Sequence, residues 1–226
     1  MIPLRDSQPS LNKPVMTGVL IAVNVLVFLF ELTLIEPAQE LFVLTYGMVP
    51  VRFTWSSLFT SMFLHGGWMH LIGNMWFLWI YGDNIEDILG RWRYLSFYLA
   101  CGAAAGLTHL AFNLDSRIPT VGASGAIAGV MGAYMRRFPH SRIVTLLPLF
   151  IFFTTIELPA YMILLYWFAI QIFSGVGDTV SQAGVQQGGV AWWAHAGGFV
   201  VGALLVKMLE RPRPMSRQRE FYWEER

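Results

Sequence analysis

The chain has 226 residues, of which 55% are hydrophobic and only 13% are charged, and its formal net charge is +1. Soluble domains carry about a quarter charged residues, so the composition excludes an ordinary water-soluble globule, and the small net charge does not indicate a nucleic-acid partner. The apolar residues form long blocks rather than alternating with polar ones, which predicts an all-α protein embedded in a lipid bilayer.

Six apolar blocks predict a bundle of six transmembrane helices. The first block contains Asn24 and Glu31 and is not followed by a small-residue cleavage site, so we expect a permanent span rather than a signal peptide. We divide the chain into a short cytoplasmic N-terminal segment (1–16), the transmembrane domain (17–209) and a charged cytoplasmic tail (210–226). The expected spans are about 17–34, 69–81 with a polar extension to 89, 94–112, 122–134, 158–173 and 191–209.

The distribution of basic residues predicts the orientation in the membrane. Thirteen of the 15 Lys and Arg residues fall on the side of the two termini, and only Arg52 and Arg117 fall in loops on the other side. Because positive charges are retained in the cytoplasm, both termini are expected there.

Two outer connections are unusual. The long connection at 35–67 is amphipathic and rich in aromatic residues such as Trp55 and Phe59, so we expect it to lie in the membrane interface between the first and second spans. The connection at 174–190 is rich in Gly, Ser and Gln and is predicted to be a mobile cap.

A few polar side chains lie within or next to the spans, where such groups are costly and therefore indicate function. His70 and Asn74 are four residues apart on one face of the second helix, with His65 just before it. Ser124 stands in the run Gly122-Ala123-Ser124-Gly125, and His195 lies near the start of the sixth span.

These side chains are expected at similar depth. About 14 apolar residues precede Arg136 in the fourth span and cover roughly 20 Å of a hydrocarbon layer of roughly 30 Å, which places Ser124 roughly 10 Å below the outer surface. By the same rise, His195 lies roughly 7 Å deep, and His70 and Asn74 roughly 5–10 Å deep. Ser124 and His195 can therefore meet.

Close packing of the fourth and sixth helices is also expected, since glycines repeat on one face of each, as in Gly125 and Gly129 or Gly198 and Gly202. A histidine beside a serine is the minimal arrangement for nucleophilic catalysis, with His195 as the base. Each residue also has a simpler interpretation: membrane Ser and Asn side chains often only join helices.

Together, His65-x4-His70-x3-Asn74, the GASG run, the AHAGG run at 194–198 and the run Gly82-Asp83-Asn84-Ile85-Glu86-Asp87 resemble the rhomboid family of intramembrane serine proteases, of the basic six-helix bacterial type. The resemblance covers about 58–209. It implies a multi-pass protein of a bacterial inner membrane that cleaves transmembrane segments of other membrane proteins near the outer face, with no metal or other cofactor and no nucleic-acid partner.

The resemblance also implies roles for individual residues. Ser124 corresponds to the nucleophile and His195 to its base, while His70 and Asn74 correspond to the oxyanion hole. His65, Gly122 and Gly125 correspond to supporting residues.

Two features depart from the family pattern. The Trp-Arg pair often found in the outer connection is absent, since Ser56 follows Trp55. Some members place an aromatic residue four positions after the nucleophile, stacked on the catalytic imidazole, but this chain has Ala128 there. What orients His195 is therefore open.

Three other functions fit parts of the pattern. A catalytically silent rhomboid-like protein would bind membrane proteins without cutting them, but such relatives typically lack the Ser or the His. A membrane metalloprotease would need the HExxH motif, which this chain does not have. A small-solute transporter is compatible with six spans, but no inverted repeat is visible.

Overall fold

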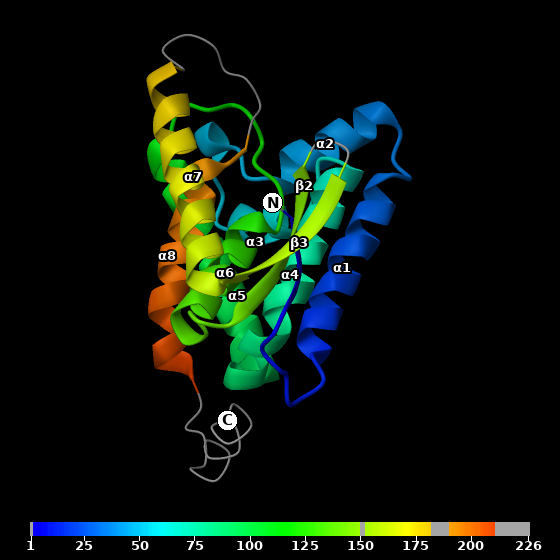
Figure 1. Cartoon of the computed structure of the whole chain (residues 1–226). Helices are drawn as coiled ribbons and strands as arrows, with labels where there is room; N and C mark the ends of the chain where they lie inside the picture. Colours follow the sequence, from blue (N-terminus) through cyan, green and yellow to red (C-terminus); the bar gives the residue numbers. More distant parts are fainter. Residues whose placement is uncertain (1, 150–151, 182–189, 211–226) are drawn as a thin grey trace, which may run out of the picture.

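The computed structural model describes residues 2–149, 152–181 and 190–210, and it is mainly helical (Figure 1). Each of the six predicted spans coincides with a long helix. The helices are α1 (Val15–Glu31), α2 (Glu36–Tyr46), α3 (Ser57–Thr60), α4 (Trp68–Leu89), α5 (Arg91–Phe112), α6 (Ser124–Arg137), α7 (Ala160–Ser181) and α8 (Trp192–Leu209), with the 3-10 turns η1 (Pro50–Arg52) and η2 (Ser61–Phe63).

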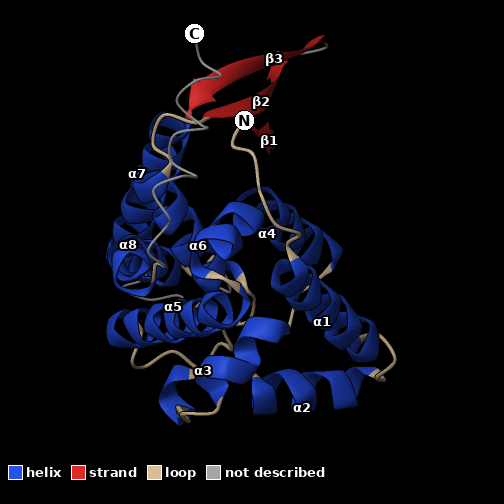
Figure 2. Ribbon diagram, turned by 90° about the horizontal axis from the view of Figure 1, so that it is seen from below, coloured by secondary structure: helices blue, strands red, loops and turns tan. Residues whose placement is uncertain are grey.

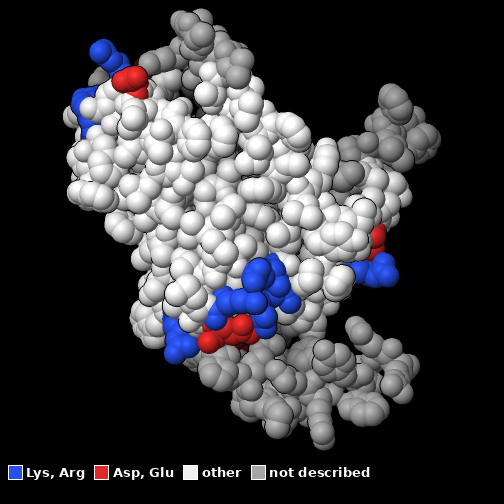
Figure 3. All heavy atoms as spheres, turned by 90° about the vertical axis from the view of Figure 1, so that its left-hand side faces the viewer, with Lys and Arg blue, Asp and Glu red and all other residues white. Residues whose placement is uncertain are grey.

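The long helices suit a membrane to different degrees. Within the described residues, α5, α7 and α8 are long and apolar enough to cross a bilayer by themselves, and α1 is a shorter apolar helix. Figure 3 shows a wide surface without charged side chains between the charged groups at the two ends of the molecule. The structure is thus a membrane-type helical bundle, and the number of crossings stays a prediction, because α6 has only 14 residues.

Helix α6 forms the centre of the bundle. Its residues from Gly125 to Tyr134 are all buried, and they pack against α4, α5 and α8. Small residues allow this close packing. A methyl group added to Gly202 of α8 would lie 2.0 Å from the carbonyl oxygen of Gly129, and one added to Gly198 would lie 2.0 Å from that of Gly125. The two backbones therefore touch, as the glycine pattern predicts.

Near the C-terminal end of α4, a buried carboxylate attaches α1 to α4. Glu86 accepts hydrogen bonds from the backbone N–H groups of Met16 and Thr17, at 2.8 and 2.7 Å, and from the hydroxyl of Thr17 at 2.9 Å. These N–H groups belong to the first turn of α1, where no intrahelical acceptor exists. Glu86 thus caps a helix that is distant in the sequence.

A three-stranded antiparallel sheet corrects the prediction of an all-α chain. Its order is β1 (Ile2–Asp6), β2 (Arg142–Leu149) and β3 (Phe152–Pro159), and it lies on one side of the bundle (Figure 2). Many residues of β2 and β3 are β-branched or aromatic, and Pro148 and Pro159 disfavour a helix, so strands form. The indole Nε1 of Trp76 on α4 donates to the carbonyl of Pro3 at 2.6 Å, which joins the sheet to the bundle.

The connections at 35–67 and 174–190 both contain helical segments. The 35–67 connection contains α2, η1, α3 and η2; Trp55 and Phe59 are exposed, whereas Leu58 and Met62 are buried. It is amphipathic, and its place in the interface stays a prediction. Helix α7 continues to Ser181, so the first part of the predicted mobile cap at 174–190 is helical instead, and 182–189 lie outside the described residues.

Candidate active site

Ser124 is the first residue of α6, at the end of a turn that needs glycine. Gly122 has a φ of 123°, in the region that side chains with a Cβ rarely adopt, and its N–H donates to the carbonyl of Ser61 at 2.9 Å. The backbone N–H groups of the first turn of α6 have no acceptor within the helix. The Ser124 side chain therefore stands beside free backbone donors.

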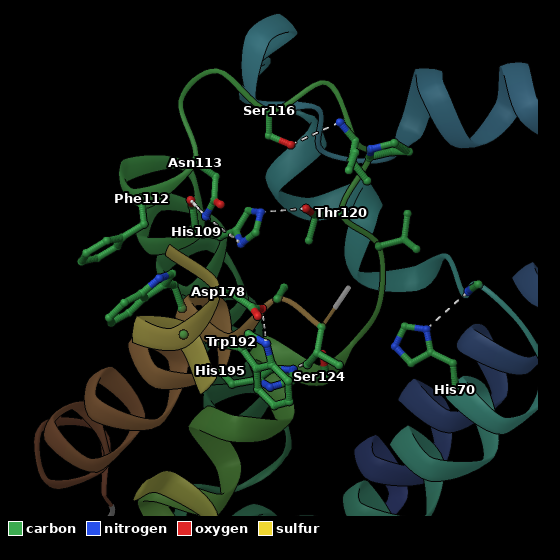
Figure 4. Close-up of a pocket in the computed structure, with 18 of the residues that line it drawn as sticks. His70, His109, Phe112, Asn113, Ser116, Thr120, Ser124, Asp178, Trp192 and His195 are labelled. Atoms are coloured by element: carbon green, nitrogen blue, oxygen red, sulfur yellow. Dashed lines mark hydrogen bonds between the residues drawn. The ribbon is translucent and has the colours of Figure 1, made fainter. Parts of the chain in front are cut away.

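The structure brings Ser124 and His195 together. His195 is buried in the first turn of α8, and its Nε2 lies 2.7 Å from the Oγ of Ser124 (Figure 4). His195, Gly198 and Gly202 share the face of α8 that touches α6. The close packing at the two glycines therefore brings His195 within reach of Ser124. With the hydroxyl hydrogen pointing at an unprotonated Nε2, the imidazole is placed to accept the proton of Ser124.

Two residues of α7 that the sequence analysis did not select contact the other side of the His195 ring. The side-chain oxygen of the buried Gln171 lies 2.7 Å from Nδ1 of His195. The Trp167 ring packs beside the imidazole, with a centroid distance of 5.7 Å and an interplanar angle of 33°. A polar residue inside a predicted span was the signal that identified His70 and Asn74, and Gln171 carries the same signal.

His70 and Asn74 of α4 lie beside Gly122. A Cβ at Gly122 would be 2.7 Å from Nε2 of His70 and 3.6 Å from Nδ2 of Asn74, so the glycine allows both side chains to approach the loop that leads to Ser124. The backbone N–H of Gly66 lies 3.4 Å from Nδ1 of His70. When Nδ1 of His70 accepts this bond (Figure 4), the ring hydrogen is on Nε2, the nitrogen that lies beside Gly122.

His65 holds Asn74 from the other side. The amide Nδ2 of Asn74 lies 3.0 Å from Nε2 of His65. Burial, and secondly the nearby His70, lower the pKa of His65 to about 4, so the ring is neutral at pH 7 and can accept this bond. A second amide hydrogen of Asn74 stays available for another acceptor.

The Ser124–His195 pair and the His70 and Asn74 side chains of α4 all line one cavity of about 1180 Å³. The lining also includes His109 of α5, whose Nε2 is 3.0 Å from the hydroxyl of Thr120 (Figure 4). Among the described residues, no group of three or more His, Cys, Asp and Glu side chains is arranged to hold a metal ion. The arrangement combines a serine, a base and several N–H donors.

Similarity to known proteins identifies the family of this chain. The Rhomboid domain family matches residues 52–212. The chain belongs to the rhomboid family. Similar proteins include the mitochondrial Rhomboid protein 1 of Saccharomyces cerevisiae, with 29% identity over 72% of this chain and 44% of that protein.

Two further relatives show the range of the family. The human mitochondrial presenilin-associated rhomboid-like protein is 31% identical over 60% of this chain and 36% of its own length. The Rhomboid protease GluP of Bacillus subtilis is 34% identical over 55% of this chain and 25% of its own length. The chain thus spans less than half the length of these curated relatives. Two of the relatives are mitochondrial proteins, and one is a bacterial protein.

Proposed function

We propose that this rhomboid protein is an intramembrane serine endopeptidase, with Ser124 as nucleophile and His195 as general base. The observation that carries the proposal is the 2.7 Å contact between the Oγ of Ser124 and Nε2 of His195 inside a cavity. One relative, GluP, is named a protease. A catalytically silent protein has no need for this contact.

The reaction follows from the positions of these two groups. The Ser124 oxygen attacks the carbonyl carbon of the scissile peptide while Nε2 of His195 takes the hydroxyl proton. The tetrahedral intermediate collapses as the same nitrogen gives the proton to the leaving amine, which leaves an ester on Ser124. A water molecule, deprotonated by His195, then hydrolyses the ester and releases the second product.

The negative oxygen of the intermediate requires donors that are already in place. The backbone N–H of Ser124, Nε2 of His70 and the second amide hydrogen of Asn74 lie around Gly122 and can supply them. His65 supports this oxyanion hole by holding the Asn74 amide. Gly122 and Gly125 support it by allowing close approach, since a Cβ at Gly125 would lie 2.6 Å from that of Ala105.

The substrates we propose are other membrane proteins, cut near the outer end of a transmembrane helix. The cavity lies at the end of α6 that is opposite the Arg136–Arg137 pair. We propose that this end faces outward from a bacterial inner membrane and that both termini are cytoplasmic. A substrate helix that unwinds easily would present its backbone to Ser124.

Labelling with a fluorophosphonate tests the proposal. A serine that is activated by a base reacts with this probe, so purified wild type is expected to be labelled at Ser124, with or without a metal chelator. Ser124→Ala is expected to show no labelling. Labelling of Ser124→Ala as fast as wild type, or loss of wild-type activity with chelator, would support a different mechanism.

A further inference from the structure

Both ring nitrogens of His195 have partners, and the partners come from two different helices. Nε2 faces Ser124 of α6 at 2.7 Å, and Nδ1 faces the side-chain oxygen of Gln171 on α7 at 2.7 Å. Gln171 is only 3% exposed and His195 only 8%, so water does not readily replace these contacts. The orientation of the base therefore depends on α7 as well as on α8.

The hydrogen bonds of Gln171 define which way its amide points. Its Nε2 lies 3.2 Å from the backbone carbonyl of Trp167, one helical turn earlier. A carbonyl only accepts, so the NH2 group must be on that side and the amide oxygen must face His195. The amide oxygen also only accepts. Nδ1 of His195 must then carry the hydrogen, which leaves the lone pair of Nε2 directed at the hydroxyl of Ser124.

Trp167 restricts the same ring from its face. The indole and the imidazole are tilted by 33° at a centroid distance of 5.7 Å. Position 128 on α6, where related proteins can carry an aromatic residue that stacks on the base, is a fully buried alanine here. Helix α7 instead contacts the ring through Gln171 and Trp167.

We propose that Gln171 is a positioning residue for the reaction, which holds His195 as the neutral tautomer with its hydrogen on Nδ1, while Trp167 holds the plane of the ring. This inference rests on the proposed function. It extends the Ser–His pair to a Ser–His–Gln arrangement in which a neutral amide occupies the place of a third, orienting group. Because Gln171 is on α7, the base is correctly held only while α7 packs against α8.

A purely structural role for Gln171 predicts different behaviour. A buried amide that only joins α7 to α8 would affect stability, but not the tautomer of His195 or the turnover number of the folded enzyme. Gln171→Leu removes the acceptor while keeping a side chain of similar size. Gln171→Glu keeps an oxygen acceptor at the same position. Ile170→Ala is the matched control, because Ile170 is the neighbouring residue on α7 and its side chain is 37% exposed.

Cleavage of a membrane-protein substrate by the purified, folded variants tests the positioning role. Gln171→Leu is expected to lower kcat by about 10–10²-fold with little change in KM, since a misplaced base slows the chemical step and not binding. Gln171→Glu should recover most of the loss, and Ile170→Ala should match wild type. Wild-type kcat in folded Gln171→Leu would overturn the inference.

Nitrogen-15 NMR of the histidines in wild type reports the tautomer of His195 in the unsubstituted site, and a variant is needed only to assign the signal. The expected signal for His195 is a neutral ring with hydrogen on Nδ1, assigned by its absence in His195→Ala. A ring with hydrogen on Nε2 would overturn the inference. This result is separate from the proposed function, which instead fails when wild type neither cleaves membrane proteins nor is labelled at Ser124.

Discussion

At the scale of single residues, the site is a set of polar groups that the bundle keeps close together in apolar surroundings. Ser124 and His195 are separated by 71 positions in the chain yet lie 2.7 Å apart. Asn74, which lines the same cavity, forms a second pair with His65 at 3.0 Å. The first pair is placed for proton transfer and the second for donating to an oxygen, so the two pairs should respond differently to substitution.

His70→Ala and Asn74→Ala should each slow turnover by 10²–10³ or less, because loss of one donor of an oxyanion hole costs at most about 3–4 kcal/mol while the other donors remain. The expected change is mainly in kcat, measured with a membrane-protein substrate. Both variants should still be labelled slowly by a fluorophosphonate. If Asn74→Ala cleaved at the wild-type rate, Asn74 would be a helix-packing residue only.

The sequence indicated Ser124, His195, His70 and Asn74 as candidates, because polar residues at equal depth stand out against apolar spans, and all four line one cavity in the structure. It was not sufficient to find the contacts of Gln171 and Trp167 with His195. Gln171 lies within the predicted fifth span, but α7 is connected to α6 through a hairpin that the sequence analysis did not expect. Which face of α7 meets α8 depends on that connection and not on local sequence.

At the scale of elements, the Ser–His contact depends on how closely α6 and α8 approach. Gly129 and Gly202 lie below the two site residues on the touching faces, and no space exists for a Cβ between them. The 3.6-residue repeat of small residues was enough to predict this pairing. The sheet was not predicted, because a short apolar run does not distinguish a strand from a buried helix.

Gly202→Ala should therefore reduce both stability and activity. Its methyl group would lie 2.0 Å from the Gly129 carbonyl oxygen, and overpacking of this kind costs typically 1–3 kcal/mol. Thermal unfolding and cleavage assays in detergent measure the two effects. The control is Gly18→Ala in α1, where nothing lies within 4 Å of the added methyl group and no loss is expected. Equal behaviour of the two variants would contradict the packing argument.

The attachment of α1 gives an independent test of the fold. Glu86→Ala removes the acceptor of three hydrogen bonds and leaves two N–H groups of α1 buried, which should cost about 1.5–3 kcal/mol. We expect a lower midpoint of thermal unfolding than for wild type. Glu40→Ala on α2, an exposed acidic residue, is the comparison that should leave the midpoint unchanged. A similar small shift in both variants would show that Glu86 does not anchor α1.

At the scale of the whole molecule, the orientation of the bundle in the membrane decides which face of the membrane the site is near. The face shown in Figure 3 has a wide area without charged side chains, and 13 of the 15 basic residues fall in segments assigned to the inner side. The site opens at the opposite end. The proposed cleavage near the outer face therefore requires the assigned orientation as well as the chemistry of the site.

Reporter fusions measure this orientation directly. A phosphatase that is active only outside the cytoplasm should be inactive when fused after Arg226 and active when inserted between Gln186 and Gln187, because basic loops are retained inside. A fluorescent protein fused after Arg226 should give the reciprocal result. An active phosphatase at Arg226 would contradict the assigned topology.

The central claim is that Ser124, activated by His195, cuts membrane-spanning substrates. Its most direct test is cleavage in vesicles that contain the purified protein and single-span proteins whose outer helix ends carry Gly and Pro. Wild type is expected to release fragments cut within the outer part of the span. Folded Ser124→Ala and His195→Ala should retain less than about 10⁻⁴ of that rate, since removal of a nucleophile or its base costs roughly 10⁶ in kcat in serine proteases. Fragments released by Ser124→Ala at a rate close to that of wild type would contradict the claim.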